Sequence, residues 1–401
     1  MKKSLFYFLL AAPLWSLAQS PQTAEDSLAR STDRKAYIGG YGEVRVTYDT
    51  REETARANVD RAVLFVGYRF NKQISFFSET EIEDAKIEGG EAHGEVALEQ
   101  LYVKFDLSKT HYLTAGLFIP RIGIINENHL PTTYNGVNRP FVERYVIPTT
   151  WREIGVGLYG TLERLGGLQY TLAVVNGMNA AGLKGGEGIR GGRFGGQDAT
   201  MSNIAVTGSV AYYIGDLRLQ ASGYYGGGAG LSPRVADSLQ LDSGPFGTPI
   251  ALVEANVQYD YKALHLRALA AAVNIPDAEN LNRAFATNVP QTMLGWYGEA
   301  AVDLLYGAYQ NKKKMLLFAR YENLDINRVV PFNGIENPEW EQQYITGGVH
   351  FQPASGVSVK FDYVQRITGE PNPALVVTPF PQQLPYYTNH GFVNLGLGYS
   401  F

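Results

Sequence analysis

Charged side chains recur at every second position along several short segments of this sequence. In one of them, Glu79, Glu81 and Glu83 alternate with Thr80 and Ile82. Because successive side chains of a β-strand point to opposite sides, such residues share one face. A face that carries both carboxylate and guanidinium groups attracts ions and polar solutes, and in an enclosed space it creates a field across their path. The residues that we expect to form this wall are Arg45, Arg61, Arg69, Glu79, Glu81, Arg320, Lys360 and Arg366.

A second group of charges lies on the longest stretch between strand-like segments, Pro120 to Trp151. Its Pro, Asn and Tyr residues favour a packed loop. We expect the loop to fold inward and form a constriction with charges of both signs. For any single wall charge, solvation of the wall is favoured over a role in selectivity. For Arg121, Arg139 and Arg144 the two readings are more even, and the main rival role is to tether the loop to the wall by ion pairs. The residues expected at the constriction are Arg121, Glu127, His129, Arg139, Glu143, Arg144 and Arg152.

Enzyme motifs give no support for catalysis. Neither H-E-x-x-H nor G-x-S-x-G occurs, and the six histidines are scattered singly, so we expect no metal site and no cofactor. The segment Gly186 to Gly191 matches a dinucleotide fingerprint in its letters only, because that motif works between a strand and a helix and this copy lies in a glycine-rich loop. We therefore expect no enzyme, although a catalytic triad assembled from separate strands stays open.

About sixteen segments alternate apolar residues with polar or small ones. In the last of them, Val393, Leu395 and Leu397 fall on one face and Asn394 on the other. This pattern is typical of strands that cross a membrane with one face toward lipid and the other toward water. The segments are Ala36 to Tyr48, Asn58 to Phe70, Lys72 to Asp84, Glu95 to Asp106, His111 to Ile119, Arg152 to Leu162, Gly167 to Asn176, Ser202 to Ile214, Asp216 to Tyr225, Ala251 to Tyr261, Ala263 to Val273, Leu294 to Tyr306, Lys314 to Leu324, Gln342 to Phe351, Gly356 to Ile367 and Gly391 to Phe401.

The fold class that follows is all-β: a transmembrane antiparallel β-barrel of about 16 strands with an inward-folded third loop. Short and long connectors alternate along the chain, as expected for a barrel with short turns on one side of a membrane and long loops on the other. Sixteen strands leave an aqueous channel unless something fills it. The alternation fails near Glu99 and Gln100, where we expect a β-bulge.

The amino-terminal residues predict export. Lys2 and Lys3 precede an apolar run from Leu5 to Trp15, so residues 1–18 read as a signal peptide, 19–35 as a mobile periplasmic segment and 36–401 as the barrel. Cysteine is absent, which excludes disulfides and a lipid-modified cysteine. The formal net charge of −5 argues against a nucleic-acid partner.

Three short segments resemble a known family. Gly116-Leu-Phe-Ile-Pro120, Phe141-Val-Glu-Arg144 and Trp151-Arg-Glu-Ile-Gly-Val-Gly157 are similar to outer-membrane porins of the phosphate-selective O/P type and their Bacteroidota relatives. The resemblance implies a homotrimeric channel in the lipid bilayer and lipopolysaccharide of a Gram-negative outer membrane. The terminal Phe401 resembles the assembly signal that the barrel assembly machinery reads.

The function that these features predict is passive diffusion of small hydrophilic solutes and ions through a loop-constricted pore. A partial ladder of basic residues on the wall keeps an anion- or phosphate-selective channel as the alternative. A barrel hydrolase and a structural or adhesive barrel are further alternatives, without positive support in the sequence.

Overall fold

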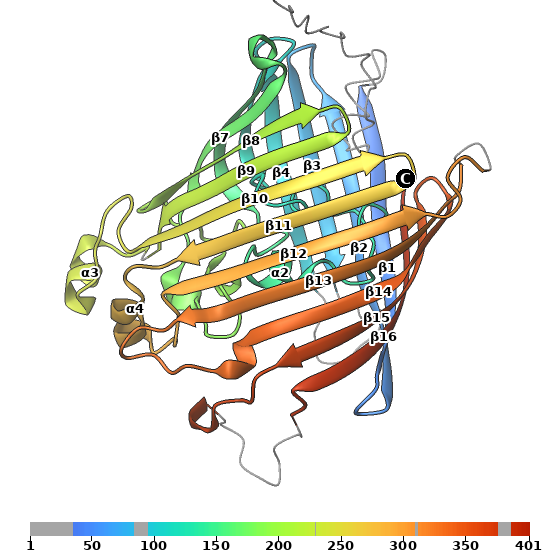
Figure 1. The fold of residues 1–401 in the computed structure, drawn as a ribbon. Helices are drawn as coiled ribbons and strands as arrows, with labels where there is room; N and C mark the ends of the chain where they lie inside the picture. The colour runs from blue at the N-terminus through green and yellow to red at the C-terminus, as the bar shows by residue number, and fades with distance from the viewer. Residues whose placement is uncertain (1–34, 84–94, 229, 309–311, 376–385) are drawn as a thin grey trace, which may run out of the picture.

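A computed structural model describes residues 35–83, 95–228, 230–308, 312–375 and 386–401. Sixteen antiparallel strands form a closed barrel in which each strand pairs with its neighbours in the chain and β1 pairs with β16 (Figure 1). This confirms the predicted fold class, and each of the sixteen expected segments overlaps an observed strand. The signal peptide expected at residues 1–18 and most of the segment expected at 19–35 lie outside the described residues.

The strands are β1 (Ala36–Asp49), β2 (Thr54–Arg69), β3 (Ile74–Glu83), β4 (Glu95–Asp106), β5 (His111–Phe118), β6 (Glu153–Leu162), β7 (Leu168–Asn176), β8 (Ile204–Ile214), β9 (Leu217–Gly227), β10 (Pro249–Tyr261), β11 (Leu264–Asn274), β12 (Thr292–Asp303), β13 (Lys314–Val329), β14 (Glu341–Ala354), β15 (Val357–Thr368) and β16 (Asn389–Ser400). The α-helices of the described chain are α2 (Phe141–Tyr145), α3 (Pro233–Leu239) and α4 (Ala278–Phe285). None of its helices is long and apolar enough to cross a membrane.

The two faces of the barrel differ as strand alternation requires. On β2, Leu64, Val66 and Tyr68 are exposed on the outside, whereas Arg61 points inward and forms ion pairs there. Similar apolar residues cover the outside of the other strands. An outer surface of this kind is stable against lipid and would be costly in water, while the charges gather inside.

The seam between the first and last strands includes the terminal residue. Tyr41 lies opposite Ser400, and Phe401 exchanges two backbone hydrogen bonds with Gly40, at 2.9 and 3.1 Å. The Phe401 side chain is exposed and stacks against Tyr399. The carboxyl-terminal residue therefore lies in the hydrogen-bonded seam that closes the barrel.

A β-bulge accounts for the failed alternation on β4. Glu79 lies opposite Gln100 and Thr80 opposite Leu98, so Glu99 is an extra residue without a partner position. The bulge keeps Glu99 in the interior, because an extra residue shifts the alternation by one position. The expected irregularity is confirmed, and it adds a carboxylate to the inner wall.

Connectors of two kinds lie at the two ends of the barrel. Turns such as residues 107–110 and 215–216 are short, whereas the loops that contain α3 and α4 extend from the opposite end (Figure 1). One connector departs from expectation: β2 begins at Thr54 instead of Asn58, so the loop between β1 and β2 has only four residues although it lies at the long-loop end.

Candidate pore constriction

The segment between β5 and β6, residues 119–152, crosses the inside of the barrel, and we call it the inner loop. Its helix α2 lies behind β12 and β13 in Figure 1. Most of its residues are buried. The strands whose side chains bond to it are β1, β3, β9, β10, β11, β12, β13, β14, β15 and β16. The inner loop is thus held from most of the barrel circumference.

Charged wall residues anchor the middle of the inner loop through its backbone. Lys360 Nζ donates to the carbonyl oxygen of Gly136 at 2.9 Å, and Asp362 accepts from the N–H of Val137 at 2.6 Å. Arg320 donates to the carbonyl oxygen of Asn138 at 3.3 Å. Lys360 and Arg320 face the interior as expected, but they are buried beneath the loop and do not form a row open to water.

Glu143 on α2 fixes the fold of the loop itself. One of its carboxylate oxygens accepts from the backbone N–H groups of Ile124 and Ile125, at 2.8 and 2.7 Å, and the other accepts from the hydroxyl of Tyr297 on β12 at 2.7 Å. Burial raises the pKa of Glu143 to about 7, although the two backbone N–H groups oppose this shift. Glu143 is therefore a buried structural acceptor and does not face a passage.

Arg121 and Glu127 lie beside a small polar hollow of ≈10 Å³ between the inner loop and strands β7 to β9. Glu127 forms an ion pair with Arg218 of β9 and lies 3.7 Å from Arg121. Burial acts to raise the pKa of Glu127, but the two arginines lower it overall. All three side chains are only partly buried. Charges of both signs are thus in contact with the hollow beside the loop.

A group of five arginines lies where the inner loop meets the connector between β7 and β8. Arg144 is exposed, and Arg190 donates to the carbonyl oxygen of Thr149 at 2.6 Å. Arg193 donates to the carbonyl oxygen of Thr150 at 2.9 Å, and burial together with Arg190 lowers the pKa of Arg193 to about 9. This arginine group consists of Arg139, Arg144, Arg152, Arg190 and Arg193.

Arg190 and Arg193 are residues that the sequence analysis missed. Arg190 belongs to the segment that matched a dinucleotide fingerprint, and Arg193 follows it by two residues. The structure places no strand–helix unit there, only a short 3-10 turn at Arg190–Gly192. The sequence signal that could have found them is the spacing Arg190-Gly-Gly-Arg193, in which two glycines separate two arginines. This spacing lets both side chains contact the inner loop.

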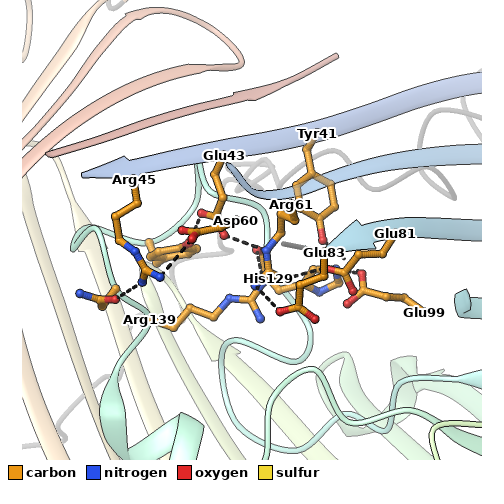
Figure 2. Close-up of polar contacts among 12 residues, drawn as sticks. Tyr41, Glu43, Arg45, Asp60, Arg61, Glu81, Glu83, Glu99, His129 and Arg139 are labelled. Carbon is orange, nitrogen blue, oxygen red and sulfur yellow. Dashed lines mark hydrogen bonds and ion pairs between the residues drawn. The ribbon is translucent and has the colours of Figure 1, made fainter. Parts of the chain in front are cut away.

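The remaining wall residues contact one another or the inner loop. Arg61 lies 2.8 Å from Glu43 and 3.1 Å from Glu81, and Arg45 donates to Asn138 at 2.6 Å (Figure 2). Arg366 lies over the ring of Tyr386, at 5.6 Å from its centroid. Arg69, on β2, is partly buried. These placements agree with an inward-facing wall whose charges are mostly paired.

The structure also brings together residues that looked unrelated in sequence. His129 of the inner loop lies 3.2 Å from Glu79 of β3 and 3.7 Å from Glu99 of β4. Figure 2 shows His129 and Glu99. Each of these residues offers one potential metal-ligand atom, and the three atoms all lie within 4.8 Å of one another. Single histidines in the sequence gave no sign of this group, because two of its members come from neighbouring strands and the third from a loop.

Comparison with curated proteins gives one informative relative. The chain is 31% identical over 342 residues to an uncharacterized protein of Aquifex aeolicus (strain VF5), and the match covers 82% of this chain and 75% of that protein. The chain belongs to the same family as the Aquifex protein. No protein-family model matches this chain. The resemblance to phosphate-selective O/P and Bacteroidota porins therefore stays a prediction.

Several solved structures share the barrel fold of this chain at low sequence identity. An anion-selective porin from Comamonas acidovorans is 11% identical with a TM-score of 0.54, and the match covers 91% of this chain and 99% of that one. Salmonella typhi OmpF, in a complex with daunomycin, is 11% identical with a TM-score of 0.54 over 91% and 97% of the two chains. OmpT, an outer membrane protein of Vibrio cholerae in its trimer form, is 11% identical with a TM-score of 0.53 over 91% and 99%. These similarities support the barrel architecture alone.

Proposed function

We propose that this protein is an outer-membrane porin that lets small hydrophilic solutes and ions diffuse past the inner loop. The observation that carries the proposal is the inner loop, which crosses the barrel interior and is anchored by polar and charged side chains to strands around most of its circumference. A loop that is fixed in this way narrows the channel by a constant amount, whereas an unattached loop would block the channel intermittently. The apolar outer face supports a place in a lipid bilayer.

Anion preference is the second candidate, and the arginine group favours it. Arg144 is exposed and the other members are only partly buried, so solutes that enter from the long-loop end meet positive charge first. The carboxylates of Glu79, Glu81 and Glu99 are more deeply buried than these arginines, and Glu81 lies 4.0 Å from Arg152 of the group. Rings of charge of one sign raise the local concentration of the opposite ion. The Comamonas protein of similar fold is an anion-selective porin.

The same proposal includes the expected surroundings and assembly of the protein. We place it in the lipid and lipopolysaccharide of a Gram-negative outer membrane, as a homotrimer, and the trimeric form of the Vibrio protein supports this arrangement. The exposed Phe401 at the seam of β1 and β16 supports a role as the assembly signal for the barrel assembly machinery. We assign no catalytic function.

Single-channel recording in a planar bilayer tests both candidates. We expect steady ohmic openings, and a reversal potential in a salt gradient that shifts toward cations when Arg139 and Arg144 are both changed to Gln. The matched control is Arg164→Gln, because Arg164 is exposed on the turn Glu163–Leu165 at the other end of the barrel. A correctly folded barrel without conductance would reject the porin, and an unchanged reversal potential in the double variant would reject only the role of these arginines.

A further inference from the structure

Glu79, Glu81, Glu99 and His129 lie close together and are all buried. Figure 2 shows Glu81, Glu99 and His129 of this group. Three glutamates in one buried group are costly, since an ionised carboxylate out of water needs a cation or several hydrogen-bond donors. The exposed fraction of Glu99 is 0%. The group therefore needs a source of positive charge.

The positive charge that the protein supplies is small and shared. Arg61 lies 3.1 Å from Glu81, but the same guanidinium is 2.8 Å from Glu43 and 3.9 Å from Glu83. Arg139 donates to the backbone oxygen of His129. Arg152 lies 4.0 Å from Glu81 as well, so two arginines serve Glu81, whereas the ion-pair partner of Glu79 and Glu99 in the described chain is the His129 imidazole.

One atom of the group lacks a hydrogen-bond partner. The Oε1 atom of Glu99 is buried and accepts no hydrogen bond from any part of the chain that the structure describes. Its second oxygen, Oε2, accepts from the hydroxyl of Tyr41 at 3.1 Å. A carboxylate buried to this degree with a free oxygen is rare, and an ion that the structure does not contain is one ordinary explanation.

The local fold orients the facing atoms. The bulge on β4 turns Glu99 inward, and Gln100 beside it donates to Oε2 of Glu79 at 2.6 Å. The other oxygen of Glu79, Oε1, then lies 3.2 Å from Nε2 of His129. Gln100 thus holds Glu79 through the oxygen that does not contact His129, and Tyr41 holds Glu99 through the oxygen that does, so each carboxylate has an outer hydrogen-bond partner, as the ligands of a metal have.

We propose that Glu79, Glu99 and His129 bind a divalent transition-metal ion, with Zn²⁺ as the best match. Ligands that are about 2.0–2.2 Å from a tetrahedral zinc ion are roughly 3.3–3.5 Å apart. Nε2 of His129 lies 3.2 Å from Oε1 of Glu79 and 3.7 Å from Oε2 of Glu99, close to this spacing, and all three ligand atoms lie within 4.8 Å of one another. One imidazole with two carboxylates selects a transition metal over Mg²⁺ or Ca²⁺, which prefer oxygen ligands alone.

The ion would join the inner loop to the barrel wall. His129 belongs to the loop, whereas Glu79 and Glu99 belong to β3 and β4. A metal that is bound by both parts stabilises the docked loop by its binding free energy, because a loop released from the wall loses two of the three ligands. This role is separate from solute passage, and it holds even if the barrel carries no current.

Zinc binding to the purified full-length barrel, without a histidine tag and stripped with EDTA, tests the proposal. Isothermal titration with Zn²⁺ should show one ion per chain, bound in preference to Mg²⁺, and Zn²⁺ should raise the thermal unfolding midpoint. His129→Gln and Glu99→Gln should each weaken Zn²⁺ binding at least about tenfold. The matched control is Glu83→Gln, whose side chain is 43% exposed and lies at the edge of the group, and which should bind Zn²⁺ normally.

X-ray absorption on the zinc-loaded wild-type protein tests the site even if a variant misfolds. The spectrum should show oxygen and nitrogen ligands including one imidazole. Equal Zn²⁺ binding by wild type and His129→Gln would mean an adventitious ion only and would overturn the proposal. Failure of the folded wild-type protein to bind Zn²⁺, or a zinc site with two or more imidazoles, would overturn it as well.

Discussion

Changing Arg320 to Met tests whether buried ion pairs hold the inner loop in place. The Arg320 side chain is 0% exposed, and its guanidinium lies 3.1 Å from Glu299 and 2.8 Å from Glu322. It also donates to the carbonyl oxygen of Asn138 in the loop. Methionine occupies similar space but leaves two buried carboxylates without their cation, which costs about 3–5 kcal/mol. Glu322 also accepts from the N–H of Val142 in α2, so the loop is directly affected.

We expect Arg320→Met to destabilise the docked inner loop more than the barrel, since the backbone hydrogen bonds between strands do not involve the Arg320 side chain. Hydrogen exchange of peptides from the inner loop should speed up by about 100- to 4,000-fold, which is the same free energy expressed as a ratio of rates. Single-channel currents of the variant should flicker between levels.

The matched control is Arg328→Met on the same strand. Its side chain is 61% exposed and lies 3.8 Å from Asp325, a surface pair worth about 0–1 kcal/mol. Equal loop exchange in the two variants would refute the anchoring role of Arg320. So would a large loss of barrel stability with unchanged loop exchange.

Two further predictions concern Glu143 and Gly116. Because burial raises the pKa of Glu143 to about 7 from 4.5, the docked loop should be most stable below pH 4.5 and lose up to about 3 kcal/mol as the pH rises through 7. Loop exchange at pH 5 and pH 8, each measured relative to Glu143→Gln at the same pH, should show this trend, and equal ratios would contradict it. Gly116→Ala should destabilise the folded barrel by roughly 2–5 kcal/mol, because φ is +133° and the new Cβ would lie 2.3 Å from the Leu101 carbonyl oxygen. The thermal midpoint and the folded yield should both fall. Gly298→Ala, where no described heavy atom lies within 4 Å of the new Cβ, should change neither, and equal behaviour of the two variants would be evidence against close strand packing at Gly116.

The barrel could be predicted from sequence because each strand carries its own evidence. A strand with lipid on one side and polar groups on the other must alternate, and the alternation alone gave all sixteen strands. The prediction failed at the start of β2, where residues from Thr54 to Asn58 are exposed on both faces. A hairpin that extends beyond its apolar band has no alternation to detect.

The site was less predictable, because its chemistry depends on which parts of the chain meet. The loop position of His129 and the bulge at Glu99 were both visible in sequence, but their contact was not. Likewise, Arg190 and Arg193 join the arginine group only because their connector folds back over the inner loop. Such contacts between distant segments leave no local pattern.

The buried charges of the wall change how selectivity and gating should be separated in this barrel. Residues such as Arg320 and Lys360 look like a basic pore lining in sequence, but they hold the backbone of the inner loop. Neutralising them should first loosen the loop, and any change in selectivity would follow from a wider or fluctuating channel. Arg144 is exposed, and other side chains anchor the loop backbone, so Arg144 is the better residue for measuring selectivity itself. A selectivity change in an Arg320 or Lys360 variant is therefore informative only when loop exchange is measured on the same sample.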